Sequence, residues 1–438
     1  MKHLKRLIRL TALFGAVSAA ALSSAQQTQA DLHMEATRLN TGDIAQMTFP
    51  WRAFYCNLAD NNNQLIINER TKNSIRVPLT KIYDDIWYIG SEYVGQYLVR
   101  TDTGWVMVDG GNNSAEMLNY NIPALQSLGM GPAAPLHGVL VTHGHGDHDG
   151  GAAQMKASTG APIYLGSGDA NNKSYAPIPL DSTATAPFDL QVGGRTFTVL
   201  PTPGHTAGAT GFVVRGHDGG KEVKLFVAGG SSLPGSLTGI ANYLTSSERT
   251  YNMIKALKVD ATSNPHISWD GSRDRIKQIQ TEGLSSPSQF TIGNELLLRG
   301  FAIVRECTAT RLAQLDPTFS APVWRVSQIE FMPGSPSTSQ ISAKLKNGWG
   351  PMADRTVTFS LDGSGAACTA TTDAEGVATC SSRFGPFRPR VDTITATFAG
   401  GTSPGIVDLG AERTAKVSSG CSDLAHAKSI PPGQNCKP

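Results

Sequence analysis

The chain has 438 residues, of which 40% are hydrophobic and 16% are charged, with 37 basic and 35 acidic side chains. This length exceeds one ordinary domain, so we expect two or three domains. The nearly balanced charge argues against nucleic acid as a partner.

The first 25 residues have the pattern of a secretory signal peptide. Four basic residues precede an apolar stretch over 10–22, and Ser23-Ser24-Ala25 follows as a small-x-small cleavage pattern. The apolar stretch is too short for a membrane anchor, and no other run is long enough to span a bilayer. We therefore expect a periplasmic or secreted protein without a membrane span. Cleavage would remove the four basic residues and leave 33 basic and 35 acidic residues.

An N-terminal arm over 26–81 is expected to precede a domain over 82–314, in which strand and helix patterns alternate. The expected strands are 86–89, 97–100, 105–108, 138–142, 162–165, 188–200 as a hairpin, 209–214 and 223–227. The expected helices are 114–128, one beginning at 152, and 247–257, 273–282 and 296–314. This interleaving predicts an α/β fold, a sandwich of two sheets with helices outside.

After a linker at 315–322, the segment 323–418 has few helix signals and many turn residues. It predicts a separate all-β sandwich with strands at 323–331, 340–344, 356–361, 368–372, 377–381 and 393–398. The last stretch, 419–438, is expected to be a tail.

The six cysteines form an even set, which in an exported chain predicts disulfides. None has C-x-x-C spacing, so a cysteine zinc site is not expected. Cys368 and Cys380 flank the turn at Asp373 with an even separation, so they could share a face and form a disulfide across a hairpin. We expect the pairs Cys56–Cys307, Cys368–Cys380 and Cys421–Cys436, although six cysteines allow other pairings.

The segment 140–151, L-V-T-H-G-H-G-D-H-D-G-G, concentrates metal-binding side chains. Four potential ligands lie within six residues and only glycines separate them: His143, His145, Asp147 and His148. A short apolar run precedes them and a helix pattern follows, so they lie where open α/β sheets place their sites. A surface histidine cluster is the alternative, but such a loop has no obvious packing use. We interpret the segment as part of a dinuclear zinc site.

The spacing of these ligands predicts their directions. In extended backbone alternate side chains share a face, so His143, His145 and Asp147 are expected to point the same way. His148 is expected to follow where the chain turns into a helix.

Two further segments supply the remaining donors. His205 lies on a Gly/Pro turn after the strand that ends at Leu200, and His266 lies in Asn264-Pro-His-Ile-Ser-Trp-Asp270. Ordinary zinc preferences sort six donors into His143, His145 and His205, with an open position, and Asp147, His148 and His266. The alternatives are a turn histidine at 205 and a helix-cap or surface histidine at 266. Histidines without companion donors are interpreted as solvated: His33, His137, His217 and His426.

Over about 82–314 the chain resembles the metallo-β-lactamase superfamily. The matching features are the H-x-H-x-D-H loop, Trp105-Val-Met-Val-Asp109-Gly-Gly111, Gly204-His205-Thr-x-Gly208 and Phe226-Val-Ala-Gly229. The resemblance implies the αβ/βα sandwich and two zinc ions per chain. It also implies that Asp109 supports a ligand histidine or the loop from behind; a plain turn aspartate is the alternative.

The chain departs from the common pattern of this superfamily after Phe226. Most hydrolases of this fold place a bridging Asp there, and β-lactamases of subclasses B1 and B2 place a Cys, whereas this chain has Gly229-Gly-Ser-Ser232. Subclass B3 enzymes carry serine in that region, and Pro265-His266 resembles their final ligand segment.

The resemblance to subclass B3 implies hydrolysis of the β-lactam amide bond by a hydroxide shared between two zinc ions, and hence antibiotic resistance. Asp147 would ligate the second zinc and orient the nucleophile. Ser231 and Ser232 would hydrogen-bond the substrate carboxylate.

Two alternatives stay open. The same metal site could hydrolyse another ester, a lactone, a phosphodiester or an envelope amide, because fold does not settle substrate. The segment 323–418 resembles bacterial immunoglobulin-like modules, on Val357-Thr-Phe-Ser360, Ala370–Thr379 and Thr395–Gly400. In the second alternative this module binds a cell-surface, carbohydrate or protein partner and the first domain is inert.

Overall fold

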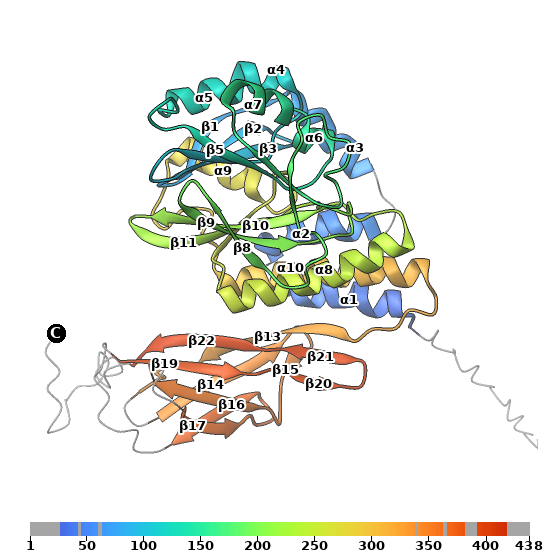
Figure 1. The fold of residues 1–438 in the computed structure, drawn as a ribbon. Helices are drawn as coiled ribbons and strands as arrows, with labels where there is room; N and C mark the ends of the chain where they lie inside the picture. Colours follow the sequence, from blue (N-terminus) through green and yellow to red (C-terminus); the bar gives the residue numbers. More distant parts are fainter. Residues whose placement is uncertain are drawn as a thin grey trace, which may run out of the picture.

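The computed structural model describes residues 27–42, 45–59, 64–337, 340–361, 366–381 and 392–417. The predicted signal peptide, the Cys421–Cys436 pair, His426 and the tail at 419–438 lie outside the described residues. Figure 1 shows an upper body of two sheets with helices and a lower body made of strands, which follow one another along the chain. No helix among the described residues has both the length and the apolar character needed to cross a membrane.

The first sheet has seven strands in the order of the sequence, β1 to β7. Its first four strands pair antiparallel, and β4 to β7 pair parallel. The strands are β1 (Arg76–Tyr83), β2 (Ile86–Ser91), β3 (Gly95–Arg100), β4 (Trp105–Val108), β5 (Leu136–Val141), β6 (Ile163–Gly166) and β7 (Ile178–Leu180). Every residue of β4 is buried, as expected for a strand with covered faces.

The second sheet has the order β12-β11-β10-β9-β8 and is antiparallel except for the parallel pair of β11 with β12. Its strands are β8 (Phe188–Val192), β9 (Arg195–Pro201), β10 (Thr210–Asp218), β11 (Lys221–Val227) and β12 (Ala261–Ser263). Gly193 and Gly194 form the predicted turn between β8 and β9 with positive φ angles of 61° and 79°.

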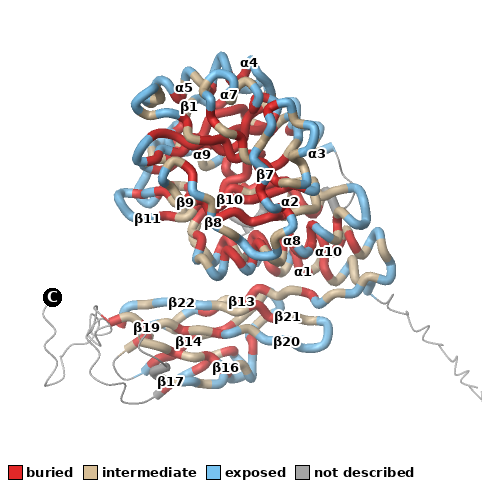
Figure 2. Tube along the Cα trace, in the orientation of Figure 1, coloured by how far each residue is buried: buried red, intermediate tan, exposed pale blue. Residues whose placement is uncertain are grey.

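Helices cover the outer faces of both sheets (Figure 1). Over the first sheet lie α4 (Ser114–Glu116), η3 (Met117–Asn121), α5 (Ile122–Ser127) and α7 (Ala152–Thr159), and over the second lie α8 (Leu237–Leu257) and α10 (Asn294–Leu315). Helix α9 (Ser272–Glu282) packs near β1. The main core lies between the two sheets, where the chain is mostly buried (Figure 2). Tyr97, Phe197 and Phe212 are fully buried there. The predicted two-sheet sandwich with outer helices is confirmed.

The two largest differences between expected and observed element bounds concern the start of the first sheet and the start of helix α8. The first sheet begins at Arg76 instead of 82, inside the expected N-terminal arm. Helix α8 begins at Leu237 instead of 247, because Ser236 caps it by accepting a hydrogen bond from the Gly239 amide. Gly239 weakens the helix pattern locally, and burial of Ile240 in tertiary contacts outweighs it.

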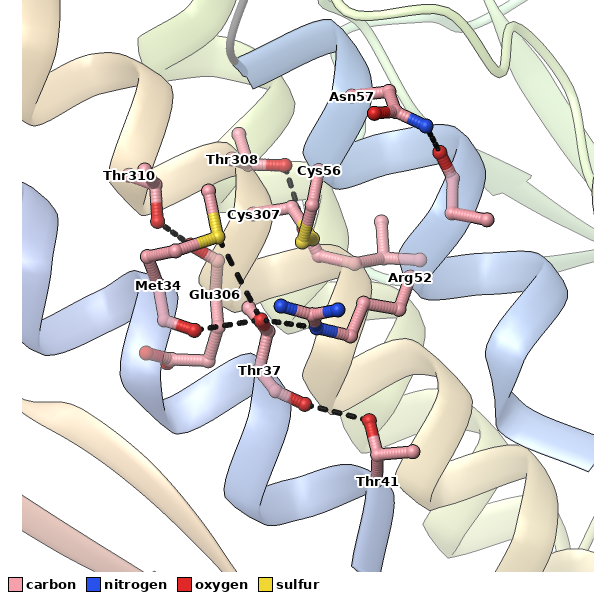
Figure 3. The surroundings of a disulfide bond; sticks show 12 residues. Met34, Thr37, Thr41, Arg52, Cys56, Asn57, Glu306, Cys307, Thr308 and Thr310 are labelled. Atoms are coloured by element: carbon pink, nitrogen blue, oxygen red, sulfur yellow. Dashed lines mark hydrogen bonds between the residues drawn. A yellow bond between two sulfur atoms is a disulfide. The ribbon is translucent and has the colours of Figure 1, made fainter. Parts of the chain in front are cut away.

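The arm itself is helical. It forms α1 (Gln29–Thr41), α2 (Ala45–Ala59), α3 (Gln64–Arg70) and the short η2 (Thr71–Ser74), and both α1 and α2 pack on α10. The predicted disulfide between Cys56 of α2 and Cys307 of α10 is formed (Figure 3). The prediction that His33 is solvated is wrong: its side chain is fully buried, with Nδ1 2.6 Å from Glu306 Oε2. The expected exposure was wrong because α1 packs on α10, a contact that local sequence does not show.

The C-terminal body is an all-β sandwich, as predicted. One sheet has the order β15-β14-β13-β21-β20 with β18 paired to β14, and the other has the order β17-β16-β19-β22. The strands are β13 (Val323–Phe331), β14 (Gln340–Asn347), β15 (Gly350–Pro351), β16 (Thr356–Leu361), β17 (Ala366–Thr371), β18 (Val377–Ser381), β19 (Thr393–Phe398), β20 (Gly401–Ser403), β21 (Ile406–Leu409) and β22 (Ala411–Lys416).

The disulfide expected across the hairpin, Cys368–Cys380, joins β17 to β18 in different sheets of the sandwich. Strands β15, β20, β21 and β22 were not expected. They are short or carry exposed polar residues, and β21 pairs parallel with β13. The immunoglobulin-like character of this sandwich stays a prediction.

Candidate metal centre

The ligand loop follows β5 and turns into a one-turn helix, α6 (Gly146–Asp149). His145 has extended backbone at the start of this helix, and its carbonyl accepts hydrogen bonds from the amides of His148 and Asp149. The expectation that Asp147 continues an extended run with the same direction as His143 and His145 is therefore wrong. The turn directs Asp147 and His148 to a separate ligand group.

Two groups of three donors result. His143, His145 and His205 form the first, and Asp147, His148 and His266 form the second; within each group the ligand atoms lie within 4.8 Å of one another. In the first, His205 Nε2 is 3.0 Å from His145 Nδ1. In the second, His266 Nε2 is 3.1 Å from His148 Nε2 and 3.6 Å from Asp147 Oδ2. The structure thus brings together the six residues that the sequence proposed, in the same two sets.

The donor chemistry fits metal ions. Burial, followed by the neighbouring histidines, lowers the pKa of His143 well below its ordinary value and lowers the pKa of His205 to about 4. Burial also lowers the pKa of His266. These three rings are therefore neutral near pH 7. Ring nitrogens of His205 and His145, and of His266 and His148, approach to about 3 Å, a contact that a shared cation makes favourable. Each group offers three protein donors and leaves further coordination positions open.

Asp109 lies behind the ligand loop. Its carboxylate is fully buried, with Oδ2 2.7 Å from Nδ1 of His148 and Oδ1 accepting a hydrogen bond of 2.7 Å from the Thr142 amide. Burial lowers the pKa of His148, but the charge and hydrogen bond of Asp109, together with the charges of Asp147 and Asp149, outweigh burial and the net shift is upward. Asp109 holds both a ligand histidine and the loop, and its backbone has a positive φ of 65°, which Asp tolerates better than most residues.

Asp169 is a supporting residue that the sequence did not single out. Its Oδ2 accepts hydrogen bonds from the Gly144 amide at 2.8 Å and the Thr206 hydroxyl at 2.6 Å. Its Oδ1 accepts one from the Gly208 amide at 2.9 Å. One carboxylate therefore ties the loop of His143 and His145 to the loop of His205. The sequence signal that could have identified Asp169 is its position three residues after β6, at the sheet edge where the ligand loop follows β5.

The close approach of these loops also depends on a glycine. A Cβ atom added at Gly166, the last residue of β6, would lie 2.0 Å from the carbonyl oxygen of Gly208. No side chain other than hydrogen fits there. The loop that carries His205 can therefore pass directly over the strand end.

The two serines after β11 make internal hydrogen bonds. Ser231 is 3% exposed, and its hydroxyl accepts from the Asn264 side chain. Ser232 contacts Nδ1 of His205 through its carbonyl oxygen at 2.8 Å and its hydroxyl at 3.0 Å. Their role in binding the substrate carboxylate stays a prediction, and in this structure Ser232 orients a ligand histidine.

The sequence model of the metallo-beta-lactamase superfamily matches residues 92–220. The chain contains a domain of this superfamily. The match includes the whole ligand loop and His205, whereas His266 lies beyond it. Five of the six donors of this metallo-β-lactamase superfamily domain are thus inside the matched segment.

Curated relatives match about a fifth to a quarter of the chain, 20% and 24% in two cases. Hydroxyacylglutathione hydrolase from Pseudomonas entomophila (strain L48) is 36% identical over 107 residues, which are 24% of this chain and 39% of that protein. Hydroxyacylglutathione hydrolase from Albidiferax ferrireducens is 40% identical over 86 residues, 20% of this chain and 30% of that protein. The chain spans less than half the length of these relatives, so their activity does not transfer as a finding.

Similar solved structures include metallo-β-lactamases. BJP-1 of Bradyrhizobium japonicum, a subclass B3 enzyme, is 22% identical, with 56% of this chain and 99% of that chain covered and a TM-score of 0.44. MIM-1 from Novosphingobium pentaromativorans is 22% identical, with 56% and 92% covered and a TM-score of 0.44. The substrate of this chain does not follow from these neighbours.

Proposed function

We propose that this protein is an exported, dizinc hydrolase of the β-lactam amide bond, similar to subclass B3 metallo-β-lactamases. The observation that carries the proposal is the pair of complete three-donor groups, three histidines in one and Asp147, His148 and His266 in the other. Residues 228–232 contain no carboxylate and no thiol, and therefore offer neither a bridging Asp nor a Cys ligand. This combination is the one that the sequence resemblance assigns to subclass B3.

The residues divide the chemistry between them. Bound zinc supplies Lewis acidity and lowers the pKa of water to about 7, which makes hydroxide available at neutral pH. His143, His145 and His205 would hold one ion, whose Lewis acidity would polarise the substrate carbonyl. Asp147 is 30% exposed, the most open donor of its group, and can accept a hydrogen bond from the attacking water while it holds the second ion.

The charge state of Asp147 supports this role. Burial raises its pKa, but His148 and His266 outweigh burial and leave the pKa below its ordinary value. The carboxylate is therefore ionised at neutral pH and acts as an acceptor. It orients the proton of the nucleophile away from the carbonyl carbon.

A second candidate is hydrolysis of a thioester or another ester by the same centre. The names of the curated relatives, hydroxyacylglutathione hydrolase, favour it, since these proteins are 36% and 40% identical to this chain over 107 and 86 residues. The segment after β11 separates the candidates, because the common hydrolases of this fold place a bridging aspartate where this chain has Gly229-Gly-Ser-Ser232.

The test is turnover by purified protein with its zinc content measured. We expect hydrolysis of nitrocefin or a carbapenem, loss of that activity with EDTA, and recovery when zinc is restored. His266→Ala is expected to remove the second metal and leave the first. A protein with two zinc ions that hydrolyses a hydroxyacylglutathione but no β-lactam would refute the β-lactamase proposal and support the second candidate.

A further inference from the structure

The metal ligand His266 belongs to a stack of aromatic rings that leads out of the superfamily domain. Its ring stacks on Trp269 with centroids 4.0 Å apart and an interplanar angle of 22°. Trp269 stacks in turn on Phe54, with centroids 3.8 Å apart and an angle of 16°. The three side chains are 5%, 3% and 2% exposed. The ring of His266 is therefore connected to Phe54 of the N-terminal arm by two consecutive stacked ring pairs.

Phe54 lies on α2, and α2 is fixed to the domain at that point. Cys56, two residues after Phe54, forms the disulfide with Cys307 of α10 (Figure 3). Trp51 of α2 packs against Gly300, where an added Cβ would lie 2.9 Å from the indole ring. The close approach and the covalent link allow α2 little freedom to shift relative to α10. The position of Phe54 is thus set by the cross-link and by helix packing.

The first metal group lacks this connection. His205 is held through its Nδ1 by Ser232, and the loops that carry His143 and His205 are joined by Asp169. All of these contacts lie within residues 142–232. His266 is therefore supported from the arm, whereas the supports of the first group and the Asp109 contact of His148 lie inside the superfamily domain.

A ring that stacks on one face loses freedom to rotate about its side-chain bonds, so its ligand nitrogen stays directed at the metal. Outer contacts that orient a ligand histidine commonly change metal affinity by about 10- to 100-fold. A stacked aromatic pair accounts for roughly threefold to tenfold on its own. Both effects on metal affinity apply to the group that contains His266, and we expect the metal affinity of the three-histidine group to be unaffected.

We propose that helix α2 is a positioning element for the second metal, in which Phe54 fixes His266 through Trp269 and the Cys56–Cys307 cross-link holds Phe54 in place. The inference rests on the proposed metal centre but concerns metal affinity, not substrate. Full occupancy of the second metal then requires the cross-linked arm, and a chain without this disulfide retains the three-histidine metal preferentially.

The first experiment is a stepwise zinc titration of the metal-free full chain against a competing chelator. Phe54→Leu removes the ring but keeps an apolar side chain, and we expect the second dissociation constant to rise about tenfold while the first changes less than about twofold. Phe301→Leu is the matched control, since Phe301 is a buried ring on α10 that pairs with Phe226 and does not belong to the stack of Phe54, Trp269 and His266. It should leave both constants unchanged.

Trp269 allows a conservative test. Its Nε1 is buried and has no hydrogen-bond partner among the described residues, so Trp269→Phe keeps the stacking plane and removes an unsatisfied donor. We expect Trp269→Phe to retain the second metal and Trp269→Leu to weaken it. Equal dissociation constants for the second metal in Trp269→Phe and Trp269→Leu would overturn the stacking argument. This comparison does not depend on whether Phe301→Leu folds.

The cross-link is tested with Cys56→Ser/Cys307→Ser, and Cys368→Ser/Cys380→Ser serves as the control that removes a disulfide of the C-terminal sandwich. The first pair should weaken the second metal selectively, and the control should not. Equal loss of both metals, or an unchanged second constant in a folded variant, would overturn the inference. Absence of zinc binding in the unmodified chain would instead overturn the metal centre itself and the inference with it.

Discussion

Asp169 offers a direct test of how the first metal group is assembled. Its carboxylate accepts three hydrogen bonds, from the amides of Gly144 and Gly208 and the hydroxyl of Thr206, at 2.6 to 2.9 Å. These donors belong to two loops that are about 60 residues apart in the chain and carry His143, His145 and His205. Asp169→Asn replaces one acceptor oxygen by an amide that can only donate.

The magnitude follows from which bonds are lost. Whichever way the substituted amide side chain turns, at least one backbone N–H faces a second donor. Leaving such a group unpaired costs about 1–3 kcal/mol, and partial exposure of Asp169 places the cost near the lower end. Because the loops carry the ligands, we expect the first zinc dissociation constant to rise about 10- to 100-fold and the second to change much less.

The assay is again zinc titration of the metal-free chain, combined with urea unfolding to measure stability. Asp189→Asn is the matched control, since Asp189 accepts a hydroxyl hydrogen bond of 2.8 Å from Thr198 within the β8–β9 hairpin. It should leave both metal constants unchanged. An equal rise of both constants in Asp169→Asn, or none in a folded variant, would refute the role assigned to the carboxylate.

Two further predictions concern other carboxylates. Asp109→Ala removes the partner of His148 and should weaken the second metal about 10- to 100-fold in the same titration; an unchanged constant would contradict its assigned role. For Asp85, burial raises the pKa, but Arg195 and His217 outweigh burial and hold it below the ordinary 3.8. The stability that this depressed pKa contributes is complete above that value and is lost as pH falls through the folded pKa. Urea unfolding should therefore show that Asp85→Asn is less stable than the unmodified chain near pH 6, with a smaller difference near pH 3; a constant difference would refute this.

The ligand set could be predicted because its information is local. His143, His145, Asp147 and His148 are close together in sequence, His205 lies in a short turn after a strand pattern, and His266 lies in the short segment 264–270. Strand and helix periods placed most elements of both sheets for the same reason, since alternation and helical spacing act over a few residues. The direction of Asp147 was missed, because the backbone hydrogen bonds of α6 form only once the loop is closed.

The supports of the ligands could not be predicted in this way. Asp169 acts across loops, Phe54 reaches His266 from a helix more than 200 residues earlier, and His33 is buried against Glu306, which is 273 residues away in sequence. Nothing in the local pattern distinguishes such residues from surface aspartates, apolar helix residues or solvated histidines.

The sequence by itself therefore determined which side chains can hold metal, the two-sheet sandwich with outer helices, and the separate β-sandwich that follows it. Only the tertiary structure decided how the six donors are held, with Asp169 joining the loops of one group and α2 bracing His266 in the other. The physical reason is that ligand chemistry belongs to individual residues, whereas orientation depends on packing between segments that are distant in the chain.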